Sequence, residues 1–584
     1  MLGGINLNNE DIIIGIDFGT TNSAACIYKD EKFQIIPSAM GYDYFPSVVA
    51  VNENGELLVG HHAKKQMASN ASNSVAEFKL KMGENETIKF NGEDKLPQEI
   101  TSYVLGRIKR DAEAYLGKPI NKAVISVPAS FDNDARNATM EAGEIAGFEV
   151  EALVDEPTAA CLTYSLTKNF LGNILVFDMG GGTLDIIIGA FDGSELVPKV
   201  TTGARFGGRN ITMALRDYLQ RDFEEQNGLK LEDYITPEYD PLIDLYNATE
   251  IAKIELSSTK TTNVHIDSIV MTDKGQRINL DKNVNRSDLN KLSDEVVKGS
   301  KEKVLEALKD AKLTKDDIDF LVFVGGPTKM PLIRESIEKL LGKSAAEGID
   351  PMVCVAQGAS IYKGGPITVG TINSLTLSVV INEKESDPLI PKNTPLPAEV
   401  TKEYHTMRDN QTSANIQIVE GESILAKENH TLHSFTLRGL PPRPKGEVAI
   451  QVKLKVDKNG IMGLSAKELS TNKKLSATFD SSNRMSSEEI KKAGLDNENL
   501  LSDYEEKIKQ RNIINDAEEV IFEGKKLIEN YSGHMLISDK NRVNENIEKL
   551  EGLLVIPKNF ELIKLITKDL RNLIEKIESE DFYY

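Results

Sequence analysis

One short pattern occurs twice in the first half of the chain, and it limits the folds that the chain can adopt. An apolar run at residues 12–16 leads into Asp17 and a Gly/Thr/Asn turn, and a second apolar run follows. The pattern returns at residues 174–177, which lead into Asp178, three glycines and another apolar run. Each copy is typical of a β-hairpin. The repeat predicts two similar lobes whose Asp-tipped hairpins face each other across an acidic, glycine-lined cleft.

The sequence between and after these hairpins alternates strand-like and helix-like segments. A third apolar run, residues 320–324, reaches Gly325-Gly326-Pro327 and then an amphipathic stretch at 332–341. Proline just inside a helix start, after a glycine pair, is a typical entry signal. Residues 102–116 and 136–146 also have helical patterns. Alternating strands and helices predict an α/β domain over residues 1–366.

The two Asp-tipped turns suggest a site for a phosphorylated ligand and Mg²⁺. A carboxylate at a strand tip can bind Mg²⁺, directly or through water. Glycines allow main-chain N–H groups to approach phosphate oxygens, and the threonine hydroxyls add donors. A single copy would be better explained as an ordinary β-turn, which also favours Asp, Gly and Thr. Two copies and the Gly325-Gly326 turn favour phosphate binding.

The pattern changes after residue 366. A short linker at 367–374 precedes residues 375–482, whose short alternating runs predict a β-sandwich, with a hairpin signal at Asn459-Gly460. Ser486 and Glu489 then form a capping-box pattern, and helical spacing continues through residues 486–584 with breaks at Gly533 and Pro557. We therefore expect an α-helical C-terminal segment of about three helices.

Charge and cysteine content restrict the partners and the compartment. The 584 residues include 69 basic and 90 acidic ones, for a net charge of −21. Such a chain is poorly suited to non-specific nucleic-acid binding, which needs a basic surface. Three widely spaced cysteines predict no disulfide framework and favour a reducing, cytoplasmic location. No secretory signal and no membrane-spanning run is visible, so we expect no membrane partner.

Several motifs together resemble the 70-kDa heat-shock protein (DnaK-type) chaperones. In the first domain they are residues 16–23, 125–129, 155–160, 177–185, 253–258 and 324–328, and beyond it 391–397 and 409–411. The resemblance covers about residues 12–480, and the last hundred residues match only in being helical. The short length and the compressed segment after Gly83 look more like the short, divergent bacterial members than the housekeeping chaperone.

The resemblance implies a multidomain fold and an ATP-driven function. It predicts an α/β actin-like (duplicated ribonuclease H-like) ATPase domain, a β-sandwich peptide-binding domain and an α-helical lid. The implied activity is Mg²⁺-dependent hydrolysis of ATP to ADP, with K⁺ as a secondary ion, which controls binding of extended apolar segments of unfolded or client proteins. The implied partners are these polypeptides, a J-domain co-chaperone and a nucleotide-exchange factor.

The resemblance also assigns roles to individual residues. The catalytic group is Lys79, Glu156, Asp178, Thr183 and Asp185. Asp17, Asp178 and Glu156 would hold the metal, largely through water. Nucleotide binding falls to Gly19, Thr20, Thr21, Asn22, Gly180, Gly181, Gly182, Thr183, Gly207, Gly208, Glu250, Lys253, Ser257, Gly325, Gly326 and Lys329. An interdomain switch uses Pro128 and Arg136, and the peptide cleft uses Ala414, Met407, Asn382 and Ile416.

Each of these residues has a plainer interpretation. Lys79 alone would be a solvated surface charge, and Pro128 a strand-ending proline. Glu250 and Lys253 lie three positions apart, so they also fit an exposed helical ion pair. The cleft residues fit a sandwich core equally well.

A few positions depart from the family pattern. Lys329 stands where an Arg usually stacks on the adenine, and Met352 where an Asp is usual. Ala152 replaces an Arg that docks the J-domain co-chaperone, and the linker lacks the usual acidic and leucine residues. We therefore expect weak co-chaperone docking and modest coupling between nucleotide and peptide.

Two other functions fit part of the sequence. A small-molecule kinase on the same duplicated fold would share the phosphate turns, but it has no use for a separate β-domain. A nucleotide-dependent adaptor with little turnover is the more serious alternative.

Overall fold

The computed structural model describes residues 12–52, 55–168, 170–236, 239–272, 274–382, 384–457, 462–470, 474–478, 485–531, 536–555 and 557–580. The chain divides into two compact units, Met1–Asn497 and Glu498–Tyr584. No described helix is long and apolar enough to cross a membrane.

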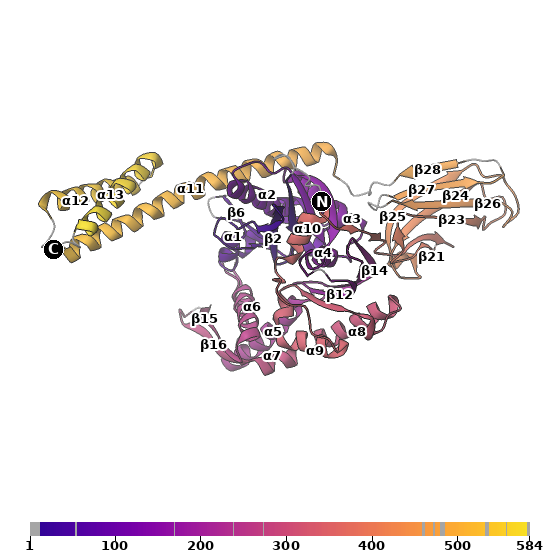
Figure 1. The fold of residues 1–584 in the computed structure, drawn as a ribbon, viewed down its shortest axis with the longest axis horizontal. Coiled ribbons are helices and arrows are strands. Elements are labelled where there is room, and N and C mark those ends of the chain that lie inside the picture. The colour runs from indigo at the N-terminus through magenta and orange to yellow at the C-terminus, as the bar shows by residue number, and fades with distance from the viewer. Residues whose placement is uncertain are drawn as a thin grey trace. The chain divides into compact units, whose positions relative to one another are not determined.

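The first lobe of the larger unit is built on a six-stranded sheet, drawn in indigo to purple in Figure 1. Its main path is β11-β10-β1-β2-β3, and β4 pairs with β2. β1 runs parallel to β10 and antiparallel to β2, which confirms the first predicted hairpin. The strands are β1 (Ile13–Asp17), β2 (Asn22–Lys29), β3 (Lys32–Ile35), β4 (Phe45–Pro46), β10 (Lys122–Val127) and β11 (Glu149–Asp155).

The second lobe has a five-stranded sheet in the order β17-β12-β13-β14-β18. Its hairpin β12–β13 confirms the second copy of the repeat and places Asp178 opposite Asp185. β17 pairs in parallel with β12, as β10 does with β1 in the first lobe. The strands are β12 (Gly172–Met179), β13 (Leu184–Phe191), β14 (Glu195–Ala204), β17 (Phe320–Val324) and β18 (Thr368–Val369).

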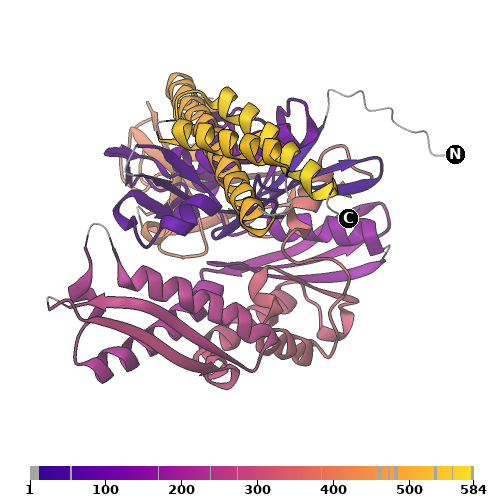
Figure 2. The same ribbon diagram turned by 90° about the vertical axis from the view of Figure 1, so that its left-hand side faces the viewer.

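Smaller elements extend both lobes. In the first lobe these are β5 (Val48–Val51), β6 (Leu57–Val59), α1 (His61–Gln66), β7 (Ser74–Ala76), the short 3-10 helix η2 (Phe78–Lys81), β8 (Ile88–Phe90), β9 (Glu93–Lys95) and the helices α2 (Pro97–Leu116), α3 (Asn133–Ile145) and α4 (Glu156–Lys168). In the second lobe they are α5 (Gly208–Asn227), α6 (Pro241–Ser258), β15 (Thr261–Met271), β16 (Arg277–Asn285), α7 (Arg286–Leu292), α8 (Asp294–Asp310) and α9 (Pro331–Leu341). The helix α10 (Cys354–Tyr362) packs against α4 and against β1, β2 and β10 of the first lobe. Figure 2 shows the indigo lobe above the magenta one.

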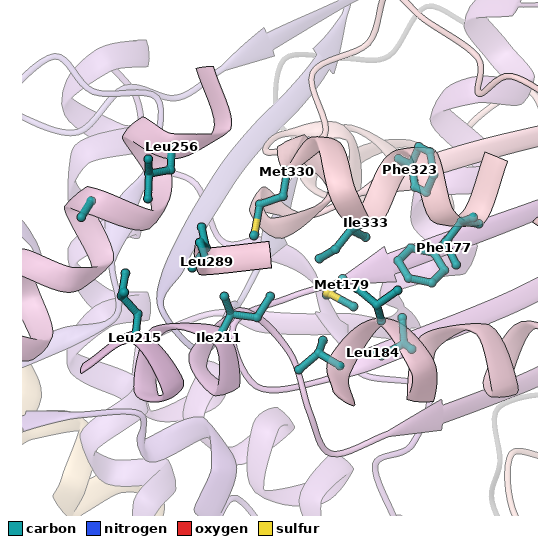
Figure 3. Close-up of a cluster of buried hydrophobic side chains, with 14 of the residues drawn as sticks. Phe177, Met179, Leu184, Ile211, Leu215, Leu256, Leu289, Phe323, Met330 and Ile333 are labelled. Atoms are coloured by element: carbon teal, nitrogen blue, oxygen red, sulfur yellow. The ribbon is translucent and has the colours of Figure 1, made fainter. Parts of the chain in front are cut away.

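Two buried clusters fix the strands that carry the turns. In the second lobe, Phe177, Met179 and Leu184 pack with α5 and α9 around the end of the β12–β13 hairpin (Figure 3). A second cluster combines Val124 of the first sheet with Val176 of the second and includes residues of α4 and α10. Because both sheets contribute to this second cluster, the ends of the two hairpins are held close together.

Two four-stranded antiparallel sheets follow and share one core. Their orders are β21-β20-β24-β25 and β23-β26-β27-β28. Val379 and Ile418 of the first sheet pack with Val452 and Leu464 of the second. The predicted hairpin at Asn459-Gly460 lies outside the described residues. The strands are β20 (Leu377–Ile381), β21 (Glu385–Ile390), β23 (Ala398–His405), β24 (Ser413–Glu420), β25 (His430–Arg438), β26 (Ala449–Val456), β27 (Met462–Glu468) and β28 (Lys474–Thr478).

The segment between the second lobe and the sandwich forms two short strands, one paired with each of them. β18 pairs in parallel with β14 of the second lobe. β19 (Thr371–Ile372) pairs with β22 (Pro395–Leu396) at the beginning of the sandwich. The predicted linker therefore extends the sheet edge of the second lobe at β14.

The C-terminal residues form three described helices. α11 (Ser487–Tyr531) begins at the predicted capping box, since Glu489 N donates to Ser486 Oγ and Ser486 N to Glu489 Oε2. α12 (Ile537–Leu554) and α13 (Phe560–Glu580) follow. Within the smaller unit, Ala517, Val543 and Leu570 share a core that joins all three helices. The predicted break at Pro557 lies between α12 and α13.

Candidate functional site

The glycine turns of the two lobes touch each other. A Cβ atom placed on Gly181 would lie 2.4 Å from Thr21 Oγ1, so only glycine allows this approach. A Cβ atom on Gly207 would lie 2.4 Å from Gly180 O. Gly325 has φ +82°, and a Cβ there would lie 2.1 Å from Met179 O. The contact between Gly181 and Thr21 joins the two lobes, and the contacts of Gly207 and Gly325 hold the glycine turns of the second lobe together beside it.

Lys79 reaches this junction from η2. Its side chain is buried, and its Nζ donates to Glu156 Oε1 at 2.5 Å and to the carbonyl oxygen of Phe18. The Nζ also lies 5.4 Å from the centre of the Phe18 ring. The plainer expectation of a solvated lysine is therefore wrong for Lys79.

Three further carboxylates surround this ion pair. Burial, with the Glu156 charge, raises the pKa of Asp17 to about 7 and that of Asp185 to about 8. The same two causes raise the pKa of Asp178 well above its usual value. Lys79 opposes each of these shifts. One lysine does not balance four acidic groups, so the site favours an additional cation.

The donor set of the site fits Mg²⁺. Asp185 Oδ1 is buried and has no hydrogen-bond partner among the described residues, and Asp17 Oδ1 accepts from Ser126 Oγ at 2.9 Å. Mg²⁺ prefers carboxylate oxygens and keeps several waters. In the described part of the chain, no three His, Cys, Asp or Glu side chains are grouped so that they could hold an ion by themselves.

The turn after Asp17 is fixed by two hydrogen bonds that no sequence pattern indicated. Ser47 Oγ donates to Gly19 O at 2.7 Å, and Gly19 N donates to Ser23 Oγ at 3.3 Å. Thr20 is buried. Asn22 Oδ1 is buried without a partner among the described residues. In the second turn Gly180 N donates to Thr183 O at 2.9 Å.

The predicted adenosine side is formed by α5 and α6. Lys253 Nζ donates to Glu250 Oε2 at 2.7 Å, to Thr212 Oγ1 at 2.9 Å and to Gly208 O at 3.3 Å. Lys253 is buried, which contradicts the alternative of an exposed helical pair. Ser257 lies one turn further along α6, where its Oγ donates to Lys253 O. The helix face therefore packs toward the glycine pair.

Lys329 and Gly326 lie on the short 3-10 helix η5 (Gly326–Lys329). Lys329 Nζ pairs with Asp350 Oδ1 at 3.2 Å, and both side chains are about half exposed. Met352 lies against Gly326, because a Cβ atom there would be 3.4 Å from the Met352 sulfur.

Arg136 connects the site to the end of the linker that precedes the sandwich. Its Nη2 donates to Asp155 Oδ1 at 2.5 Å and to Ser374 Oγ at 3.4 Å, and its Nε donates to Phe131 O. Asp155 immediately precedes Glu156. Pro128 ends the nearby strand, and its carbonyl oxygen accepts from Phe131 N at 3.1 Å.

The sandwich contacts α3 through acidic groups and one histidine. Asn133 N donates to the buried carboxylate of Glu420 at 3.0 Å, and His430 Nε2 lies 3.0 Å from Asp134 Oδ2. A cavity of about 550 Å³ lies beside this contact and includes Arg136, Ala152 and the linker residues among its walls. No sequence pattern indicated the pairing of His430 with Asp134.

Of the predicted cleft residues, Ala414 and Ile416 lie on β24, while Met407 and Asn382 lie in the turns that follow β23 and β20. Ala414 is half-buried on β24 and packs against the core, while Ile416 on the same face is buried in it. Met407 follows β23 and is 46% exposed, and its N donates to Gln411 Oε1 at 2.9 Å. Asn382 follows β20 with φ +54°.

Comparison with known families agrees with this arrangement. The family model described as Hsp70 protein matches residues 13–95 and 85–582. The chain belongs to the Hsp70 family. The resemblance predicted from the motifs is therefore confirmed. The expectation that it ends near residue 480 is wrong, because the match reaches residue 582.

The chain is similar to several curated relatives over most of its length and most of theirs. A protein named Chaperone protein DnaK from Methanothermobacter thermautotrophicus is 37% identical over 581 residues, covering 97% of this chain and 96% of its own. The DnaK of Cenarchaeum symbiosum is 39% identical, covering 88% and 80%, and that of Endomicrobium trichonymphae is 38% identical, covering 91% and 87%. Hsp70 proteins hydrolyse ATP and bind polypeptides, so this chain is an ATP-dependent molecular chaperone.

Proposed function

We propose that ATP binds between the two glycine turns and that Lys79 supplies positive charge to the phosphoryl group as it is transferred. The observation that carries this proposal is the buried Lys79–Glu156 pair, which lies among the buried Asp178 and Asp185 and the half-buried Asp17. Phosphoryl transfer requires positioning and charge stabilisation rather than covalent chemistry by the protein. A bound Mg²⁺ would supply further charge at the phosphates, held by Asp17, Asp178 and Glu156 largely through water.

The remaining predicted residues have matching positions in this proposal. Gly180, Gly181 and Gly182, with Thr20, Thr21 and Asn22, form the phosphate turns, while Thr183 and Asp185 orient the attacking water. Glu250, Lys253 and Ser257 of α6, with Gly325, Gly326 and Lys329, hold the adenosine. The arrangement of the two sheets supports an actin-like duplicated fold for residues 1–366.

The two-sheet domain of residues 375–482 is the proposed peptide-binding domain, and residues 486–584 form the proposed lid. Extended peptides would bind by main-chain hydrogen bonds and one apolar pocket, with Ala414 at its floor and Met407 and Asn382 beside it. Clients of this type are unfolded or partly folded proteins, and J-domain and exchange factors are proposed partners. The three cysteines are buried free thiols, which supports a reducing, cytoplasmic location.

A turnover assay tests this function. ATP hydrolysis by the full chain is measured with Mg²⁺, with and without a panel of short apolar peptides. We expect Mg²⁺-dependent turnover that apolar peptides stimulate and acidic peptides do not. Turnover without any response to peptide would contradict the proposed peptide binding. Binding of ATP with little or no hydrolysis would favour the adaptor alternative and exclude the proposed roles of Lys79 and Asp185.

A further inference from the structure

Two segments of the second lobe meet at Gly208, on the proposed adenosine side of the site. A Cβ atom placed on Gly208 would lie 2.6 Å from Pro327 Cγ of η5 and 3.2 Å from Lys253 Nζ of α6. The first distance leaves no room for a side chain, so η5 and α6 approach each other across a residue that must stay small. These two segments are therefore the walls that a base meets beyond the phosphate turns.

The polar side chains of the α6 wall are bonded within the protein. Lys253 Nζ donates to Glu250 Oε2 at 2.7 Å and to Thr212 Oγ1 at 2.9 Å. Its third proton is directed to Gly208 O at 3.3 Å. Ser257 Oγ donates to Lys253 O at 3.4 Å. On α6, which is described throughout, these contacts use every side-chain donor of the face formed by residues 250, 253 and 257.

The wall formed by η5 also offers few groups that could recognise a base. Pro327 has no N–H, and Thr328 is buried with its Oγ1 donating to Gly325 O at 2.6 Å. Lys329 Nζ pairs with Asp350 and is about half exposed. A further proton of this ammonium group can meet N7, an acceptor that adenine and guanine share. Lys329 therefore attracts a purine without distinguishing the two.

The exposed position next to the α6 face is apolar. Ile254 is 60% exposed and follows the buried Lys253. Around the helix it lies about 40° from Glu250 and about 60° from Ser257. Ile251 is similarly exposed, at 58%, but it lies about 100° from Glu250 and about 120° from Ser257. Ile254 is thus the exposed apolar side chain that borders the face, and a flat ring that covers it removes apolar surface from water.

We propose that the site selects a purine ring but does not distinguish adenine from guanine, so that the chain binds and hydrolyses GTP as well as ATP. Ile254 covers one face of the ring. The inference rests on the proposed function, because it places a nucleotide at the same glycine turns. Strong discrimination requires hydrogen bonds to the edge of the base, whereas an apolar contact rejects a changed polar group only weakly.

The chemical step is the same for both nucleotides. The oxygen of water bonds to the γ-phosphorus as the bond to the β–γ bridging oxygen breaks, and the two water protons go to inorganic phosphate and to solvent. Lys79 and the carboxylates around it act on the phosphates, which ATP and GTP share. The identity of the purine should therefore affect binding slightly and the chemical step hardly at all.

Isothermal titration of the full chain with ADP, GDP and CDP in Mg²⁺ tests the inference. The Kd for GDP should lie within about tenfold of the Kd for ADP. CDP should bind more weakly than ADP, because its single ring covers less of Ile254. Turnover with saturating GTP and with saturating ATP, measured as phosphate release, completes the comparison, and both nucleotides should be hydrolysed.

Ile254→Ser and Ile251→Ser form a matched pair of variants. Ile254→Ser should raise the Kd for ADP and for GDP alike, by about three- to tenfold, because it removes the same apolar contact from both. Ile251→Ser should keep both Kd values within about twofold, since this side chain is turned away from the face. Both side chains are more than half exposed, so neither substitution disrupts the core.

Several results would overturn the inference. One is GDP that binds more than about tenfold more weakly than ADP, or GTP that is not hydrolysed while ATP is. Another is CDP that binds as tightly as ADP, which would show that the base contributes nothing. A third is a wild-type Kd in Ile254→Ser. Wild-type protein that bound neither ADP nor GDP would instead overturn the proposed function, so the two failures are distinguishable.

Discussion

Asp155 and Glu156 are neighbours in the chain, and their carboxylates bind cations from two different parts of the molecule. Glu156 accepts from Lys79 at 2.5 Å, and Asp155 accepts from Arg136 at 2.5 Å. Arg136 in turn reaches Ser374, the last residue of the linker before the sandwich. The junction of β11 and α4 therefore carries both ion pairs, one at the proposed hydrolysis site and one beside the segment that leads to the proposed peptide domain.

Lys79→Ala should slow ATP hydrolysis by about a hundredfold or more, the scale for losing one preorganised electrostatic group, about 3 kcal/mol. ATP binding should change little, because the glycine turns and Mg²⁺ hold the phosphates. Single-turnover hydrolysis measures the effect. Lys81→Ala is the control, since Lys81 lies on the same 3-10 helix with its side chain 48% exposed. A rate for Lys79→Ala within a few-fold of wild type would exclude the proposed role.

Arg136→Ala should reduce stimulation of the ATPase by peptide more than it reduces the basal rate. The substitution leaves Asp155 without its cation and removes the contact with Ser374. Breaking a largely buried pair in this way also costs stability, about 3 kcal/mol or more, so Arg136→Lys should accompany it as a variant that keeps the charge. The measurement is the ratio of stimulated to basal turnover. An unchanged ratio in Arg136→Ala would show that Arg136 does not link peptide binding to ATP hydrolysis.

Contact between the sandwich and α3 should weaken as the pH rises. The Asp134 carboxylate raises the pKa of His430 to about 9. A raised histidine pKa stabilises the contact fully below its ordinary value of 6.5, and this stabilisation is lost as the pH rises toward 9. Burial raises the pKa of Glu420 from 4.5 to about 7, so its ionisation also disfavours the contact, increasingly from pH 4.5 to 7. Titration of either group therefore weakens the contact as the pH rises.

The contact is followed by the distance between fluorescent labels on the two domains, in ATP, from pH 6 to 9. In wild type, the equilibrium constant for docking should fall about tenfold between pH 6 and pH 9, after allowance for the partial exposure of His430. His430→Gln should flatten the upper part of the curve and Glu420→Gln the lower part. The charged groups of Asp132, Asp134 and Arg136 also face His430 and Glu420. The contact therefore keeps some dependence on pH in either variant. His405→Gln is the control, because His405 pairs with Glu403 on its own strand, and a flat wild-type curve would refute the prediction.

Ala414→Val should shift peptide preference toward smaller apolar side chains. Alanine leaves space for about two more methylenes than valine would, worth about 1–2 kcal/mol when filled by a Leu or Phe of the peptide. Flexible Met407 beside the pocket adapts to large side chains. Affinities for Leu- and Phe-centred peptides measure the change. Ser413→Val is the control, because Ser413 is exposed on the other face of β24. Equal losses in both variants would argue against a pocket at Ala414.

Much of the fold was predictable because local patterns determine it. The hairpins whose first strands end at Asp17 and Asp178, the strand at 320–324 and the capping box at Ser486 all follow from apolar runs and turn residues. The buried position of Lys79 was not predictable from local pattern, since a lysine in a short 3-10 helix reads as a surface charge. Its burial depends on Glu156, a partner 77 residues away.

The contacts between parts of the chain were harder to predict. The linker lacks acidic and leucine residues, and from this we expected weak docking. The structure adds β18 to the edge of β14 and supplies charged contacts elsewhere, through His430 and Glu420. These residues lie almost 300 positions from their partners in α3. No sequence periodicity links positions that far apart, so only the folded chain brings them together.

The central claim is that nucleotide at the Lys79 site controls peptide binding by the sandwich. The most direct test is the dissociation rate of a labelled apolar peptide in ATP and in ADP, with Lys79→Ala protein to maintain the ATP state. The account predicts faster release in ATP, by less than the roughly hundredfold that about 3 kcal/mol of coupling would give. Equal release rates in the two nucleotides would contradict it.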